Sequence, residues 1–142
     1  MPKVTSTVVT TVSVINLQAV QGDDELYFCT VEVYNPTTDK FEPFDLQFTT
    51  KIQFTAKDRI SQAIVYNTDD DAGGVLAPPY YPNEIIHTDP NIGKFTLGIS
   101  AVATTLFAIK TYEYDMQITK TGAGKIKTIA QGTLTIGKQI TP

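Results

Sequence analysis

The chain has 142 residues, a length that suits one domain with a single hydrophobic core. Its hydrophobic content of 42% and charged content of 18% are typical of a folded protein rather than of a disordered one. The net charge is −4, and Arg59 is the only arginine. Because a protein that grips a nucleic-acid backbone needs clustered Lys and Arg, we expect no direct binding of nucleic acid.

The N-terminal segment, MPKVTSTVVTTVSVINL, does not have the form of a signal peptide, because Thr and Ser interrupt its apolar residues throughout. No run in the chain approaches the roughly 18 apolar residues of a membrane span. We therefore expect synthesis in a cytoplasm and no membrane partner. Residues 4–17 favour β-structure but are mixed in phase. Two alternatives follow: a first strand, or an arm over residues 1–14 that pairs with a neighbouring subunit through Val8, Val9, Val12 and Val14.

Alternation of apolar and polar residues, which is typical of a half-buried strand, is clearest over residues 46–56. Residues 25–34 alternate as well. Residues 35–44 are rich in Pro, Asn and Asp, and we predict that they connect these two strands as a hairpin. The apolar face of the clearer strand carries Leu46, Phe48, Ile52, Phe54 and Ala56.

Further short strands are predicted along the rest of the chain, with a bulge or bend at Gly132. One helical turn capped by Ser100 is predicted within residues 100–109. Short strands separated by Gly, Pro and Asn predict an all-β fold. We expect an antiparallel β-sandwich, immunoglobulin-like or jelly-roll-like, forming one domain over residues 15–142. The further strands are predicted at residues 63–66, 94–99, 112–118, 126–131 and 133–136.

Residues 68–90 are predicted to form a long irregular segment that holds four of the eight prolines. Tyr80 and Tyr81 lie among these prolines. Tyrosines on a Pro-rich loop make good contact anchors because little side-chain entropy is lost on docking. Both are therefore interface candidates. The alternative is that the two rings fold back and cap the sandwich.

Residues 121–125, TGAGK, invite comparison with a phosphate-binding loop. That motif requires Gly where Thr119 stands and Ser or Thr where Ile126 stands. It also requires a following helix, whereas the sequence after Lys125 is strand-like. We interpret TGAGK as the turn of a β-hairpin.

Cys29 and His87 are each the only residue of their type. A disulfide, a zinc site or a His-based triad needs partners, so we predict an inert buried thiol and a structural imidazole. NTDDDAGG, residues 67–74, alternates oxygen side chains as calcium loops do, but Ala72 and Pro78 stand where Gly and a bidentate acid belong. A solvated acidic turn is the favoured interpretation, and weak Ca²⁺ binding is the alternative. We predict no catalytic residue, no metal site and no cofactor.

The order of several motifs is similar to that in small virion proteins of tailed phages, including N-terminal domains of baseplate proteins. The resemblance covers about residues 15–142, while the arm and the length of the 68–90 segment are additions. The matching segments are QGDD before ELYFCTVEVY, FDL leading into TTKIQFTAK, GKFTLGIS followed by the helical turn SAVATTL, and YEYDM with GTLTI as the closing hairpin.

This resemblance implies a non-enzymatic structural protein of the phage virion, an adaptor or subunit of the tail, baseplate or fibre apparatus. Its partners would be other virion proteins and copies of itself, in a homo-oligomer within a symmetric particle. One alternative is a capsid decoration or head-fibre protein. The other is a carbohydrate-binding module, against which the absence of Trp counts.

Overall fold

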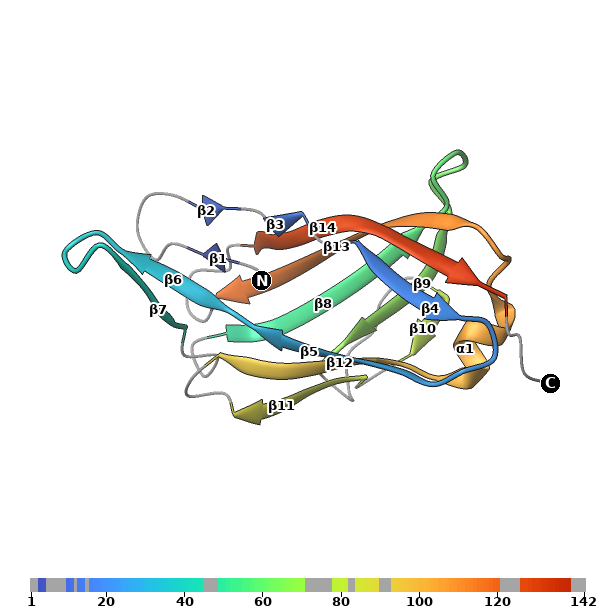
Figure 1. Cartoon of the computed structure of the whole chain (residues 1–142), viewed down its shortest axis with the longest axis horizontal. Helices are drawn as coiled ribbons and strands as arrows, with labels where there is room; N and C mark the ends of the chain where they lie inside the picture. Colours follow the sequence, from blue (N-terminus) through green and yellow to red (C-terminus); the bar gives the residue numbers. More distant parts are fainter. Residues whose placement is uncertain are drawn as a thin grey trace.

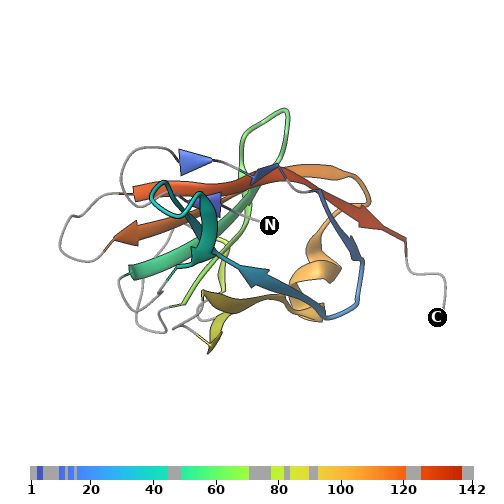
Figure 2. The same ribbon diagram turned by 60° about the vertical axis from the view of Figure 1, so that its left-hand side comes forward.

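The structure is a computed structural model of the chain and describes residues 3–4, 10–11, 13–14, 16–44, 49–70, 78–81, 84–89, 93–120 and 126–138. These residues form strands β1 to β14 and one short helix, α1 (Figure 1). Turned by 60°, the molecule shows two main layers of strands, with α1 at one end between them (Figure 2). The all-β sandwich and the short helix expected from the sequence are confirmed.

The larger sheet has the order β10-β9-β8-β13-β14-β3, and β4 also pairs with β14. Its central pairs, β9 with β8, β8 with β13 and β13 with β14, are antiparallel. The pairs at its two edges are parallel. Its strands are β3 (Ser13–Val14), β4 (Leu17–Val20), β8 (Thr49–Lys57), β9 (Ile64–Asp69), β10 (Tyr80–Tyr81), β13 (Thr111–Lys120) and β14 (Ile126–Gly137).

The smaller layer is an antiparallel sheet of three strands in the order β11-β12-β5. A further sheet, with the order β2-β1-β6-β7, extends from it on the left of Figure 1. These strands are β1 (Lys3–Val4), β2 (Thr10–Thr11), β5 (Glu25–Thr30), β6 (Glu32–Asn35), β7 (Lys40–Pro43), β11 (Ile85–Asp89) and β12 (Lys94–Ile99).

This strand order is that of a variable-type immunoglobulin sandwich. In such domains one sheet has the order A-B-E-D, and the other carries extra strands beside its G-F-C core. Here β5, β12 and β11 correspond to B, E and D, while β14, β13 and β8 correspond to G, F and C. Among the described residues, no strand occupies the A position next to β5. The immunoglobulin-like alternative for the sandwich is therefore the one observed, with an incomplete smaller sheet.

The apolar face predicted on β8 lies in the core, where Ile52, Phe54 and Ala56 are fully buried. The predicted face residues Leu46 and Phe48 lie outside the described residues. Phe54 stacks on the ring of Tyr114 from β13, with centroids 5.0 Å apart. Because Cys29 is the only cysteine, no disulfide within the chain joins the two sheets as it does in many immunoglobulin domains. The buried Tyr66 hydroxyl of β9 instead donates to Gly98 O of β12 at 2.7 Å.

The predicted continuous strand over 25–34 is wrong, because the chain changes sheets at the fully buried Val31. The Val31 amide donates to Gly93 O at 2.8 Å, and the Phe44 amide donates to Val31 O at 3.0 Å. The predicted hairpin between the 25–34 and 46–56 strands is also wrong. β6 pairs instead with β7, which lies inside the expected connection, and β8 belongs to the other layer.

Two further expectations are corrected. The predicted irregular segment 68–90 contains the end of β9, all of β10 and all of β11. Gly132 is not a bulge, because it pairs in regular register with Tyr114. The register shift of this hairpin lies between Ala130 and Thr128, which face consecutive residues of β13.

Helix α1 (Ala101–Leu106) is capped as predicted, since the Ser100 side chain accepts a hydrogen bond from the Ala103 amide. The loop 21–24, which joins β4 to β5, is tied to this helix. Thr104 Oγ1 donates to Asp23 O at 2.7 Å, and the Ala101 amide donates to Asp24 Oδ1 at 2.6 Å. These bonds fix the point at which the chain crosses from the larger sheet into β5.

Candidate assembly surfaces

β5 is an edge strand whose outer backbone groups have no partner strand among the described residues. In an antiparallel pair, alternate residues direct both N–H and C=O toward the partner. The Val31 amide bonds to Gly93 on the β12 side. By alternation Tyr27 and Cys29 also face β12, and the N–H and C=O groups of Leu26, Phe28 and Thr30 face the open edge.

This edge lacks the usual protection against strand pairing. Natural sheet edges are commonly blunted by Lys, Pro, bulges or inward-pointing charge. Residues 26–31, LYFCTV, contain none of these residue types, and the β5–β12 register runs without a bulge. The edge is therefore suited to accept another strand.

An apolar groove of about 440 Å³ opens beside this edge, between β5 and the larger sheet. Leu97, Met116 and Ala130 contribute apolar lining, with Leu17 of β4 and the β5 residues Tyr27 and Cys29 around them. The Tyr27 hydroxyl donates to Gln18 O at 2.6 Å and so links β5 to β4. Burial of the ring holds the Tyr27 pKa well above its usual value, so this donor keeps its proton at every physiological pH.

The outer face of the smaller sheet carries exposed apolar side chains. Phe28 is 83% exposed, Leu26 57% and Ile86 56%. Phe28 of β5 is opposite Thr96 of β12, and Thr96 is in turn opposite Ile86 of β11. The side chains of Phe28 and Ile86 therefore lie in one row on the same face of the sheet. Leu26 and Phe28 were recognisable in the sequence as apolar residues on the second face of the 25–34 segment, but that pattern did not identify them as exposed.

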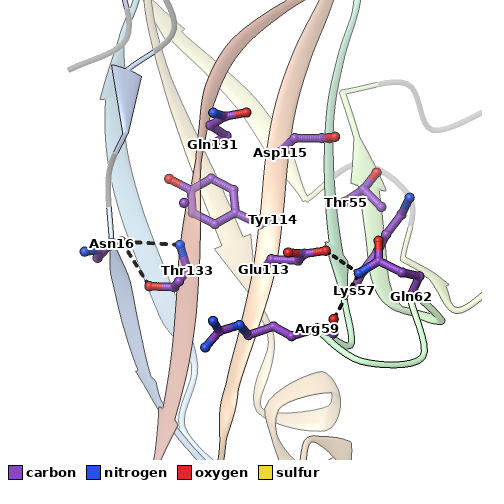
Figure 3. A pocket seen from close by; sticks show the side chains of 11 residues that line it. Asn16, Thr55, Lys57, Arg59, Gln62, Glu113, Tyr114, Asp115, Gln131 and Thr133 are labelled. Atoms are coloured by element: carbon purple, nitrogen blue, oxygen red, sulfur yellow. Dashed lines mark hydrogen bonds between the residues drawn. The ribbon is translucent and has the colours of Figure 1, made fainter.

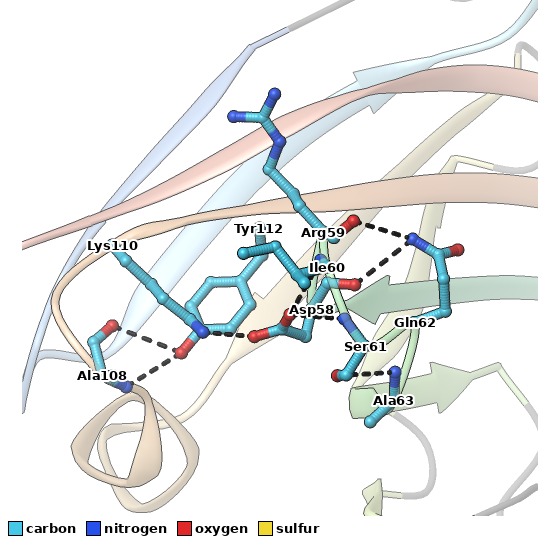
Figure 4. Close-up of polar contacts among 9 residues, drawn as sticks. All are labelled: Asp58, Arg59, Ile60, Ser61, Gln62, Ala63, Ala108, Lys110 and Tyr112. Carbon is cyan, nitrogen blue, oxygen red and sulfur yellow. Dashed lines mark hydrogen bonds and ion pairs between the residues drawn. The ribbon is translucent and has the colours of Figure 1, made fainter.

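A second apolar group lies near the end of the sandwich that carries α1. Its members are Ile60, which is 94% exposed, Val102, Leu106 and Ile109. The turn that presents Ile60 is organised by Asp58 (Figure 4), whose Oδ1 accepts from the amides of Ile60 and Ser61. Lys110 Nζ donates to Asp58 Oδ2, and this contact with the two amide bonds holds the Asp58 pKa well below its usual value.

The outer face of the larger sheet forms a polar hollow of about 500 Å³ (Figure 3). Lys57, Arg59, Glu113 and Asp115 place both signs of charge around it. Burial raises the Asp115 pKa, while the positive charge of Lys57 opposes that rise. Asn16 Oδ1 accepts from the hydroxyl and the amide of Thr133 at one margin. The hollow offers hydrogen bonds to a polar ligand.

The interface candidates Tyr80 and Tyr81 lie against the body of the protein. Tyr81 stacks on the buried Tyr66, with ring centroids 5.1 Å apart. The Tyr80 hydroxyl donates to Asp69 Oδ1 at 2.8 Å. Both side chains are half-buried. These contacts are those of the capping alternative, in which the two rings pack against the sandwich.

Of the candidates in the arm, Val14 lies in β3, whose backbone pairs with β14 at Gln131. Val8, Val9 and Val12 lie outside the described residues. The described parts of the arm therefore pair with neighbouring strands of the same chain, in registers of one or two residues.

The expected solvated acidic turn over residues 67–74 is wrong where the structure describes it. Asn67 and Asp69 are buried in β9, and Asn67 Oδ1 accepts from Thr55 Oγ1 at 2.9 Å. Asp70 accepts from the Ile52 amide and contacts His87 Nε2 at 2.7 Å. The side-chain oxygens of Asn67 and Asp70 thus hold strands together. Among the described residues, no group of three or more acidic, His or Cys side chains could hold a metal ion.

Cys29 is half-buried beside the core, and burial raises its thiol pKa to about 11. Residues 121–125 lie outside the described residues, but the strands on either side pair antiparallel in adjacent register, as a hairpin requires. The strand β14 follows where a phosphate loop needs a helix. In the part of the chain that the structure describes, no helix is long and apolar enough to cross a membrane.

Comparison with solved structures gives a distant structural likeness. No family model and no curated protein matches the chain. Among solved structures, the NK cell receptor Nkp44, described as a triggering partner in natural cytotoxicity, is 16% identical to this chain. The match covers 90% of this chain and all of the receptor chain, with a TM-score of 0.45. The order of strands in the two sheets is what identifies the fold.

Proposed function

We propose that this protein is a non-enzymatic structural component of a tailed-phage virion, an adaptor or subunit of the tail, baseplate or fibre apparatus. The observation that carries the proposal is the unprotected, uncharged edge of β5, bordered by the exposed Phe28 and Leu26. Main-chain hydrogen bonds at such an edge supply affinity, and neighbouring apolar pockets supply specificity. The order of motifs, which resembles that in phage virion proteins, suggests the biological setting.

The surroundings of the Cys29 thiol and of the His87 imidazole support a non-enzymatic role. A thiol with a pKa of about 11 is protonated near neutrality and is a poor nucleophile. His87 Nε2 lies 2.7 Å from Asp70 Oδ2, and the same carboxylate accepts from the Ile52 amide in the core sheet. The His87 imidazole thus helps to attach β11 to the larger sheet.

The test is to purify phage particles produced from a genome that encodes this chain with a C-terminal epitope. Quantitative mass spectrometry should find it in a fixed copy number per particle, and cryo-electron microscopy should place it in the tail, baseplate or fibre. Density on the capsid would support the capsid decoration or head-fibre alternative. Absence from washed particles, with the chain left in the host lysate, would overturn the proposal.

A carbohydrate-binding module is the second candidate, and the polar hollow of Figure 3 is the observation that favours it. Its side chains offer both donors and acceptors, as sugar hydroxyls require. However, Tyr114, the one aromatic side chain among the described residues that line the hollow, is 5% exposed and stacks on Phe54 in the core. A glycan array distinguishes the candidates: saturable binding that is lost in Asp115→Ala and kept in Phe28→Lys would establish this one.

A further inference from the structure

We infer that the groove beside β5 accepts the N-terminal arm of a second copy of this chain, so that two subunits exchange arms. The inference deepens the proposed assembly role and rests on it, because it identifies the surface and its occupant. In the variable-type sandwich the position next to β5 belongs to strand A, and no described strand fills it. The donated arm would complete the smaller sheet.

The groove fits an extended, uncharged segment. On the β5 side, the N–H and C=O groups of Leu26, Phe28 and Thr30 can pair with an added strand. Below them, Leu97, Met116 and Ala130 form apolar lining that alternate side chains of the added strand can contact. The groove therefore recognises an uncharged strand that is rich in small apolar side chains.

Residues 4–17, VTSTVVTTVSVINL, have that composition, because they contain no charge and are mostly β-branched. A strand of period two places Val8, Thr10 and Val12 on one face. Nine extended residues, 4–12, span roughly 30 Å at about 3.3 Å per residue. This exceeds the six residues of β5, so the arm is long enough to cover the whole edge.

The position at which the arm leaves its own subunit favours exchange. Ser13 pairs with Ala130, and Ala130 also lines the groove, so the arm departs beside the groove of its own chain. A two-fold axis near this point would bring each arm to the groove of the other subunit. Such reciprocal exchange of an identical element is a common route to dimers.

Direction argues against the arm filling its own groove. Residues 13–14 and 17–20 run along β14 from Ala130 to Gly137, parallel to that strand. Of the described pieces that precede them, β1 pairs with β6, past the end of β5, and β2 pairs with β1. To enter its own groove, the chain would have to reverse at Ser13. The pairings of β1 are short, so releasing them breaks few hydrogen bonds.

Disulfide cross-linking of the full-length protein tests the inference. In a Cys29→Ser background, one protein carries Val8→Cys with a mass tag and a second carries Phe28→Cys without the tag. The two are mixed, unfolded, refolded together and oxidised. Arm exchange predicts a tagged–untagged linked dimer, several-fold above the level given by an Ile60→Cys partner. Ile60 is 94% exposed, against 83% for Phe28, but lies on the Asp58 turn, outside the groove. Thr10→Cys and Val12→Cys, each used in place of Val8→Cys, test other registers of the arm against β5.

A double variant, Val8→Cys with Phe28→Cys in one chain, separates the alternatives. A link found only within single chains would show that the arm occupies its own groove and would overturn the inference. Linkage no higher than in the Ile60→Cys control at all three arm positions would overturn it as well. Neither result depends on phage particles. If the arms exchange efficiently but the protein is absent from virions, the proposed function would be wrong, whereas the role of the groove as acceptor of the arm would stand.

Discussion

Ser13 pairs with Ala130 at the start of the described part of β3, and Ala130 also lines the apolar groove beneath the free edge of β5. The base of the arm and the groove therefore meet at one residue. An immunoglobulin-like sandwich in which no described strand fills the position next to β5 needs either protection of that edge or a partner for it. Because residues 26–31 include no charge and no Pro, we attribute the open edge to assembly.

Replacing Phe28 by Lys should block strand addition at β5, because a charge beside an open edge disfavours pairing. The melting temperature should change little, since the side chain is 83% exposed. Sedimentation velocity should show loss of the associated species. Phe41→Lys, on the exposed strand β7, is the matched control and should associate as the wild type does. Equal association of both variants with the wild type would count against the β5 surface.

Gly93 should be intolerant of a side chain. Its φ is +75°, and an added Cβ would lie 2.3 Å from Val31 O, at the corner where the chain leaves β5. The left-handed conformation alone costs an L-residue about 1–2 kcal/mol. Gly93→Ala should therefore lower the free energy of unfolding by at least about that amount in a denaturant titration. Gly137→Ala is the control, because its Cβ would meet Ala19 O at an ordinary 3.7 Å.

The Asp58–Lys110 contact should make stability depend on acid pH. The Asp58 pKa is lowered from about 3.8 in the folded state, chiefly by the Lys110 side chain. Its stabilising contribution is therefore present above the unfolded pKa and is lost as pH falls below about 4. In Lys110→Met, the melting temperature should fall at pH 7 and should decline less steeply between pH 4 and pH 2. A profile parallel to that of the wild type would contradict this assignment. Lys138→Met serves as the charge-matched control.

Cys29 should react slowly with alkylating agents in the folded protein. Only the thiolate is reactive, and burial raises its pKa to about 11. The rate of carbamidomethylation should rise about tenfold per pH unit between pH 7 and pH 10, as the thiolate fraction does at a pH well below the pKa. A Thr38→Cys thiol in a Cys29→Ser background is the exposed reference. Equal rates for the two thiols at pH 8 would refute a buried, protonated Cys29.

Local alternation predicted the core strands well, because the side chains that alternate along β8 and β13 are sorted by burial alone. It failed where tertiary contacts decide. The break at Val31 depends on bonds to Gly93 and Phe44, which are distant in sequence. β10 pairs with Asn67 and Thr68 across a Pro-rich segment that shows no alternation.

The candidate surface was visible in the sequence only in part. Leu26 and Phe28 are apolar residues on the otherwise polar face of the 25–34 segment. Which face of this segment meets solvent depends on how β5 pairs with β12. The open edge itself is a property of sheet order, which single-strand patterns do not contain. Tyr80 and Tyr81 looked exposed because of their prolines, whereas the sheet β9–β10 brings Tyr81 onto Tyr66.

Hydrogen exchange at the β5 edge tests the central claim most directly. The amides of Leu26, Phe28 and Thr30 point away from β12, so they should exchange rapidly in the isolated monomer, while those of Tyr27 and Cys29 are protected by β12. In the associated protein, the account predicts that these three edge amides become protected and that the two inner amides change little. Edge amides that exchange equally fast before and after association would contradict assembly through β5.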